Sequence, residues 1–104
     1  MAKRKVIWSL RAHQDRLEIL EYWIKRNKSK TYSEKLYSLI NSSVELIAEH
    51  PEIGRTTDEP GVRLKIVRDY YLVYEDDGEY LNILAIWDTR QNPAKLKKLL
   101  KKSQ

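Results

Sequence analysis

Apolar residues recur at helical spacing in two segments of the first half of the chain. Within residues 12–27, Leu17, Leu20 and Ile24 fall on one side of a helix, while acidic residues and lysine occupy the other. Residues 31–50 repeat the pattern with Leu36, Leu39, Ile40, Val44 and Ile47. Only a short polar link separates the two segments, so we expect two helices that pack as an antiparallel hairpin.

The second of these helices carries signals at both ends. Thr31 and Glu34 have the spacing of a capping box, in which each side chain bonds a free backbone amide at the start of a helix. Pro51 ends the helix, because the residue before a proline is disfavoured in the helical conformation. In the loop that follows, Gly54 and Gly61 are available for positive φ angles.

The period changes to two in the segment 62–68, which predicts a strand. Its apolar residues take one face: Val62, Leu64 and Ile66. Arg63 and Lys65 alternate onto the other face, and Arg68 at the end of the segment is expected to join them. We expect the apolar face to contact the helices and the cationic face to meet solvent.

Three further segments are rich in strand-forming residues. The stretch 6–8 is short and follows three cations, so we predict an edge or outer strand there. Residues 70–74 and 81–87 are mostly apolar on both sides, as is typical of central strands. The polar segment 76–79 supplies the turn between them.

This order of elements predicts an α+β fold. We expect an N-terminal strand, an antiparallel two-helix hairpin and a three-stranded antiparallel meander, with the hairpin covering one face of the sheet. A length of 104 residues predicts one domain, spanning residues 1–104. From about residue 94 to residue 104, three leucines stand among five lysines, which predicts either a short C-terminal helix or a tail that orders only on a partner.

Composition narrows the possible functions. The net charge of +5 favours acidic partners such as RNA, DNA or an acidic protein segment, although the lysines can also serve solubility alone. The chain has no cysteine and only two histidines, far apart, so we expect no metal and no cofactor. It has no apolar stretch long enough for a signal peptide or a membrane span, which predicts a cytoplasmic protein without a membrane partner.

Three motifs, taken in order, resemble the RelE/ParE superfamily of bacterial type II toxins. The first is 50–54, which reads His-Pro-Glu-Ile-Gly and ends the second helix. The second is the strand pair 63–74, and the third is the closing segment 86–93, Ile-Trp-Asp-Thr-Arg-Gln-Asn-Pro. The similarity covers about residues 6–96. It implies the RelE/ParE-like fold and a toxin that a cognate antitoxin neutralises.

The superfamily resemblance implies two possible targets. RelE-like members enter the ribosome and cut messenger RNA, whereas ParE-like members poison DNA gyrase. The fold is the same for both, so it does not choose between them. If the chain is an endonuclease, the resemblance assigns Arg63 and Lys65 to its two basic strand positions and Arg90 to the arginine after the last strand. Tyr71 is then the candidate proton donor.

Other residues are candidates for contacts with a partner. Arg68 and the C-terminal cations Lys95, Lys97 and Lys98 are expected to contact RNA phosphates or another target. Trp87 is expected either in the core or in contact with the antitoxin. The antitoxin is expected to cover the exposed sheet face and its basic rim, docking at the first strand or in an apolar groove beside the helices.

Two departures from the family pattern count against the nuclease. Tyr71 stands where the family usually has an arginine, and no tyrosine follows Arg90. A general acid or base is therefore hard to assign. We favour a ParE-like, gyrase-poisoning toxin over a ribosome-dependent mRNA endonuclease, which needs no metal. A basic binding module without toxicity is the third possibility.

Overall fold

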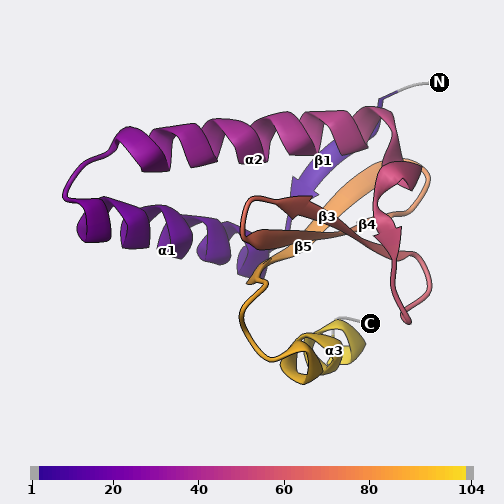
Figure 1. The fold of residues 1–104 in the computed structure, drawn as a ribbon. Helices are drawn as coiled ribbons and strands as arrows, with labels where there is room; N and C mark the ends of the chain where they lie inside the picture. Colours follow the sequence, from indigo (N-terminus) through magenta and orange to yellow (C-terminus); the bar gives the residue numbers. More distant parts are fainter. Residues whose placement is uncertain (1–2, 103–104) are drawn as a thin grey trace.

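The structure is a computed structural model that describes residues 3–102. In chain order it contains β1 (Lys5–Trp8), α1 (Leu10–Asn27), α2 (Thr31–Glu49), the short 3-10 helix η1 (Pro51–Ile53), β2 (Arg55–Thr56), β3 (Val62–Val67), β4 (Tyr70–Asp76), β5 (Tyr80–Asp88) and α3 (Pro93–Lys102). Figure 1 shows the helical hairpin on one side of the sheet and α3 on the other. The predicted α+β fold and its order of elements are confirmed.

The strands form one sheet in the order β1-β5-β4-β3-β2. β3, β4 and β5 make the predicted antiparallel meander. β1 is the predicted edge strand, and it pairs in parallel with the first half of β5, from Lys5 opposite Tyr80 to Trp8 opposite Ile83. The two-residue β2, which the sequence did not suggest, extends the other edge beside β3.

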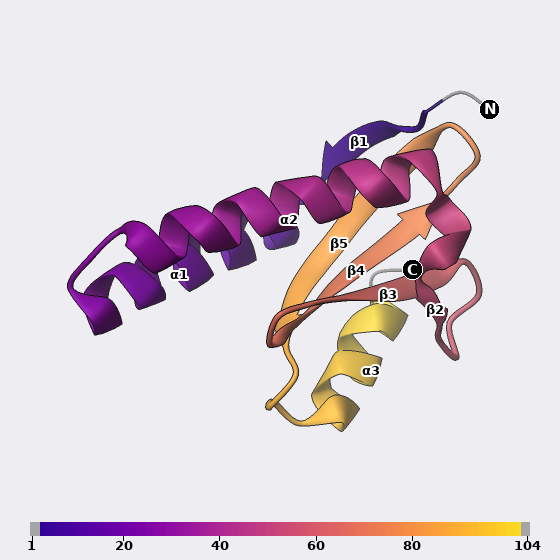
Figure 2. The same ribbon diagram turned by 45° about the horizontal axis from the view of Figure 1, so that its top comes forward.

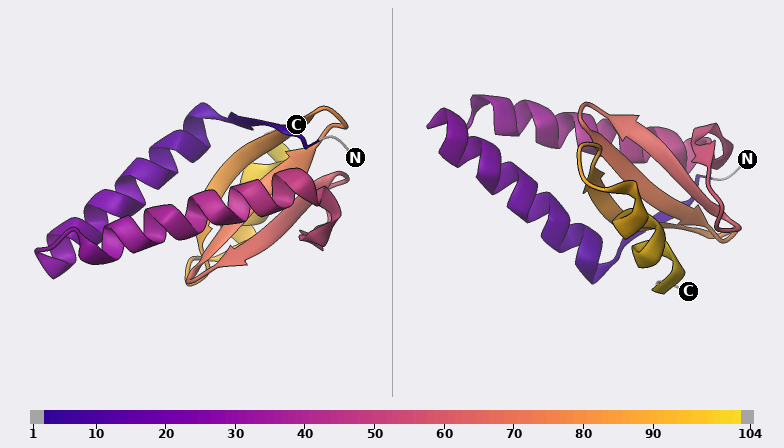
Figure 3. Two further views of the ribbon diagram at one scale, coloured as in Figure 1. Left: turned by 90° about the horizontal axis from the view of Figure 1, so that it is seen from above. Right: turned by 60° about the horizontal axis from the view of Figure 1, so that its bottom comes forward.

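The helices α1 and α2 run antiparallel and cover one face of the sheet (Figure 2). Leu36, Ile40 and Ile47 of α2 are buried there against Leu72 and Leu81 of the central strands. The hairpin continues past the sheet, so its far end has no strand beneath it (Figure 3). The apolar stripes predicted for the two helices therefore bury only part of their length.

The second face of the sheet is covered by α3. Leu96 and Leu100 are buried against Val73, Ala85 and Trp87. The C-terminal segment is therefore a helix that docks on its own sheet, which was one of the two expected alternatives. With helices on both sides, β4 and β5 are buried on both faces, as their apolar sequences predicted.

The predicted orientation of β3 is wrong. Val62 and Leu64 belong to the apolar cluster beneath α3, and Val67 belongs to the cluster beneath the hairpin. By alternation, Arg63 and Lys65 share the hairpin face with Val67. The two-residue period of the side chains separates the two faces of a strand, but it does not indicate which face packs against the hairpin and which against α3.

Two further local predictions are also wrong. Ile66, expected against the helices, is 58% exposed. Thr31 is the first helical residue of α2 rather than its cap, and its amide is bonded instead by the Oγ of Ser29, at 3.2 Å. The expected capping box therefore does not form, although the helix begins and ends within one residue of the predicted bounds.

Gly54 serves a close approach rather than a positive φ angle. Its φ is −71°, whereas Gly61 has the predicted positive φ, 81°. A Cβ atom on Gly54 would lie 2.3 Å from the hydroxyl oxygen of Tyr74, which no side chain could tolerate without movement. The absence of a side chain at Gly54 thus lets the η1 turn pack against Tyr74 of β4.

The Tyr74 hydroxyl joins this turn to the sheet. The side chain is fully buried, and its oxygen accepts a hydrogen bond from the Gly54 amide, at 2.9 Å, and donates one to the carbonyl of Pro51, at 2.6 Å. Buried backbone groups need such partners because they have lost those of water.

We expect Tyr74→Phe to lower the free energy of unfolding by about 1–3 kcal/mol, because it leaves two buried backbone groups without a partner. Urea denaturation followed by circular dichroism measures the change. Tyr22→Phe is the matched control, since Tyr22 is 50% exposed and the loss there should be close to zero. Equal midpoints for the two variants would contradict this role of the hydroxyl.

An ion pair fastens the start of the chain to the end of β4. The Nε of Arg4 lies 2.7 Å from Oδ1 of Asp76, and the two side chains are 20% and 27% exposed. The hydrogen bond from Arg4 holds the pKa of Asp76 below its usual range. The ionised carboxylate is therefore favoured more in the folded chain than in the unfolded one.

This pairing predicts a dependence of stability on pH. The contribution of Asp76 is fully present above its unfolded pKa, about 3.9, and is lost as the pH falls through the lower folded pKa. Asp76→Asn should therefore destabilise the protein more at neutral pH than at about pH 2. Urea denaturation at both pH values measures this. Glu21→Gln, which removes an exposed pair with Lys25, should change little at either pH, and a pH-independent effect of Asp76→Asn would contradict the mechanism.

Candidate functional site

Arg63 and Lys65 lie on the sheet face that the hairpin covers. Arg63 holds the η1 turn, because its Nη1 donates to the carbonyl oxygens of Glu52, at 2.9 Å, and Gly54, at 2.7 Å. Lys65 is half-buried and has no ion-pair partner among residues 3–102. Part of the Arg63 guanidinium is thus engaged in holding the fold together.

Tyr71 lies on the opposite face, in the cluster beneath α3. The guanidinium of Arg55 stands 5.8 Å from the centre of its ring, within the range of a cation–π contact. Of the four residues expected for a nuclease, Arg63 and Lys65 are therefore on one face of the sheet, Tyr71 is on the other, and Arg90 lies beyond the end of β5. The strands do not bring all four to one surface.

Arg90 forms a two-point pair with Asp88. Its Nε lies 3.1 Å from Oδ1 and its Nη2 lies 2.9 Å from Oδ2, while the arginine side chain remains 64% exposed. The hydrogen bond from Arg90 holds the pKa of Asp88 below its usual range, and the Asp88 carboxylate raises the pKa of Arg90. Arg90 is thus a cation whose position is set by an ion pair with a neighbour two residues away in sequence.

The expected phosphate or target contacts are spread over two places. Arg68 is exposed in the β3–β4 turn, where its φ of 57° places it in the left-handed region. Lys95, Lys97 and Lys98 are exposed on α3, and Lys97 lies 3.5 Å from Asp58 in the β2–β3 loop. These lysines cover the outer side of α3, because its leucines face the sheet.

Trp87 is in the core, one of its two expected positions. Its side chain is 6% exposed beneath α3, and its Nε1 is buried with no hydrogen-bond partner among the described residues. Trp87 also lines part of a cleft next to α1. Its contact with an antitoxin stays a prediction.

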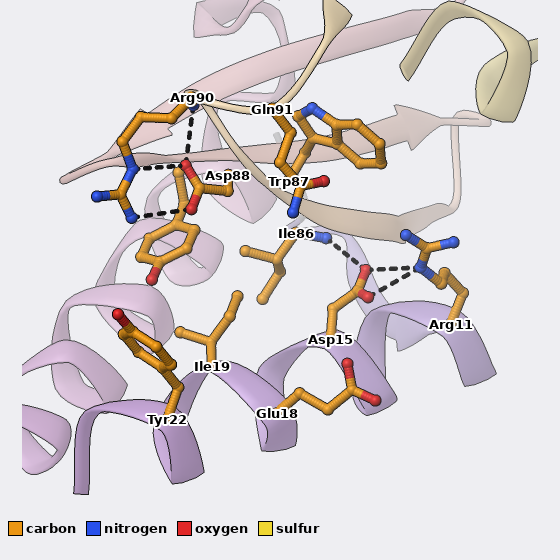
Figure 4. Close-up of a pocket in the computed structure, with 11 residues that line it drawn as sticks. Arg11, Asp15, Glu18, Ile19, Tyr22, Ile86, Trp87, Asp88, Arg90 and Gln91 are labelled. Carbon is orange, nitrogen blue, oxygen red and sulfur yellow. Dashed lines mark hydrogen bonds and ion pairs between the residues drawn. The ribbon is translucent and has the colours of Figure 1, made fainter. Parts of the chain in front are cut away.

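That cleft, of about 380 Å³, lies between α1 and the second half of β5. Figure 4 shows α1 below it, with Asp15 and Glu18 pointing up, and the end of β5 with Asp88 and Arg90 above. The cleft therefore brings together charged side chains from the first and last thirds of the chain. Its lining includes two of the predicted site residues, Trp87 and Arg90.

Asp15 connects the two walls of this cleft. Its Oδ2 accepts a hydrogen bond from the backbone amide of Ile86, at 3.1 Å, and both of its oxygens accept from Nε of Arg11, at 2.8 and 3.0 Å. Burial raises the pKa of Asp15 and outweighs these stabilising bonds. Asp15 is thus a half-buried carboxylate that accepts a hydrogen bond from the backbone of β5.

Sequence reasoning missed Arg11 and Asp15. Their spacing of four residues on a helix was a visible signal for an ion pair. Nothing local indicated that Asp15 would meet Ile86, which lies 71 residues further along the chain.

Neither a metal centre nor a membrane span is found among residues 3–102. No group of three or more His, Cys, Asp or Glu side chains there could hold a metal ion. No helix in that range is long and apolar enough to cross a membrane.

Comparison with known proteins identifies the family. The sequence profile described as "ParE toxin of type II toxin-antitoxin system, parDE" matches residues 6–93. A solved structure described as "Chromosomal ParDE TA system from P. aeruginosa" has the same fold, with a TM-score of 0.72 and 19% identity, over 83% of this chain and 96% of that one. No curated protein sequence is significantly similar. Because the profile spans most of the sequence, the chain belongs to the ParE toxin family of type II toxin–antitoxin systems.

Proposed function

We propose that this protein arrests bacterial growth by poisoning DNA gyrase and that a cognate antitoxin neutralises it in the cytoplasm. The observation that carries the proposal is the match of the ParE toxin profile to residues 6–93. The net charge of +5 supports a target that contains nucleic acid, such as gyrase engaged on DNA.

The placement of the nuclease candidates supports gyrase over the ribosome. Cleavage of RNA through the 2′-hydroxyl needs an acid, a base and cations around one phosphate. Here Tyr71 and Lys65 lie on opposite faces of the sheet, and Arg63 is bonded to two carbonyl oxygens of the η1 turn. A ribosome-dependent endonuclease remains the second candidate, because Lys65 and Arg90 keep their charges near the surface.

The antitoxin would find an apolar surface at the far end of the hairpin. Leu20 and Ile24 of α1 and Tyr37 of α2 line a groove there, and its polar lining residues are Lys30, Ser33 and Glu34. Tyr37 is 46% exposed. An amphipathic helix would bury this groove with its apolar face, while its polar edges meet one charge of each sign in the lining. Since α3 already covers the second sheet face, the antitoxin has less open sheet than the sequence suggested.

Assays of both targets on one preparation test the proposed function. We expect the purified protein to inhibit gyrase supercoiling, to leave messenger RNA on programmed ribosomes uncut, and to lose its effect when the antitoxin is added. Cleavage at the ribosome that Arg90→Ala abolishes would instead establish the endonuclease. If induced expression did not arrest growth, the non-toxic binding module would be favoured.

Tyr37→Ala should weaken antitoxin binding about tenfold, as is common for a buried aromatic contact, without changing inhibition of gyrase. Isothermal titration calorimetry measures the affinity. Leu46→Ala is the matched control, since Leu46 is a 44% exposed apolar residue of the same helix outside the groove. Equal affinities for the two variants would place the antitoxin elsewhere.

A further inference from the structure

One edge of β5 is only half paired. β1 pairs with residues from Tyr80 to Ile83, and then the chain turns at Ser9 into α1. On its other side, β5 stays paired with β4 as far as Asp88. From Leu84 to Asp88, the α1 edge of β5 thus has no strand partner among residues 3–102.

Side chains stand in for the missing strand. The Oγ of Ser9 donates to the carbonyl of Leu84, at 3.0 Å, and Asp15 accepts from the amide of Ile86, at 3.1 Å. In an antiparallel strand, the backbone N–H and C=O of one residue point to the same edge, and every second residue shares that edge. The carbonyl of Ile86 and the amide of Asp88 therefore also face α1. Neither group bonds to another element of the described chain.

The cleft described above runs along this unpaired edge. α1 forms its other wall with Arg11, Asp15, Glu18 and Tyr22. Ile86 and Asp88 are two residues apart, about 7 Å along the strand, so an extended segment of about three residues would span them. Such a segment offers backbone donors and acceptors at the spacing of the strand, which a nucleic acid does not.

The charges of the cleft select the kind of segment. Two carboxylates already have arginine partners: Asp15 with Arg11, and Asp88 with Arg90. The third, Glu18, receives only the amide of Gln14, at 3.1 Å. The lining therefore carries one unneutralised negative charge, which favours a lysine or arginine in the occupant and repels phosphates.

We propose that this cleft receives an extended segment of the antitoxin, which adds to β5 as a strand at Ile86 and Asp88 and places a basic side chain beside Glu18. The inference rests on the proposed function, because it takes the antitoxin as the partner. A backbone carbonyl of the antitoxin segment replaces Asp15 as the acceptor for the Ile86 amide. Asp15 keeps its ion pair with Arg11. This contact is separate from the hairpin groove, which would take a helix.

Blocking the cleft tests the proposal. Glu18→Trp puts a bulky side chain at the cleft wall from an exposed helical position, so the fold should be kept, as circular dichroism and thermal unfolding can verify. Glu21→Trp is the matched control, since Glu21 is exposed on the same helix but does not line the cleft. By calorimetry, Glu18→Trp should weaken binding of the co-encoded antitoxin at least about tenfold and Glu21→Trp less than about threefold.

Amide hydrogen exchange gives an independent readout on the wild-type complex. The Asp88 amide, which lacks an acceptor in the free protein, should exchange at least about tenfold more slowly when the antitoxin is bound. If the antitoxin binds while Asp88 exchange is unchanged and both tryptophan variants bind equally, the strand proposal is overturned and the toxin–antitoxin function stands. If the antitoxin does not bind the wild-type protein at all, both fail.

Discussion

Burial of β4 and β5 on both faces is the constraint on which the rest of the structure depends. Leu72 and Ile83 face the hairpin, while Val73, Ala85 and Trp87 face α3. Removal of this apolar surface from water is the main favourable term available to a small domain. Burial of both faces requires a helical layer on each side of the sheet. On the second side this layer is α3, a lysine-bearing helix that packs on the sheet through two buried leucines.

The same constraint leaves the edges of the sheet incomplete. Only three strands, one of them two residues long, flank the two central ones, and β1 ends early where the chain turns into α1. The backbone of β5 then needs other partners, because unpaired buried peptide groups are costly. Ser9 and Asp15 meet part of that need, and the Ile86 carbonyl and Asp88 amide remain for a partner.

Elements that depend on local periodicity could be predicted from the sequence. The two helices follow from spacing, the edge strand and the central strands follow from their strand-forming and apolar residues, and the C-terminal helix was one of two alternatives. The orientation of β3 could not be predicted, because both of its faces meet a helical layer and period two does not name the layer. The role of Gly54 was also hidden, since it depends on the hydroxyl of Tyr74, twenty residues away.

The candidate site divides in the same way. The sequence indicated the cations of the site, but whether their side chains meet depends on which face of the sheet each strand position takes. In the structure, Lys65 and Tyr71 lie on opposite faces. A phosphate at a reaction centre needs charges that converge, whereas binding a partner needs only edges, grooves and charges that match along a surface. This chain offers the second kind of feature in two places, the hairpin groove and the open edge of β5. Its chemistry is therefore that of recognition, and this favours a toxin that acts by holding another macromolecule.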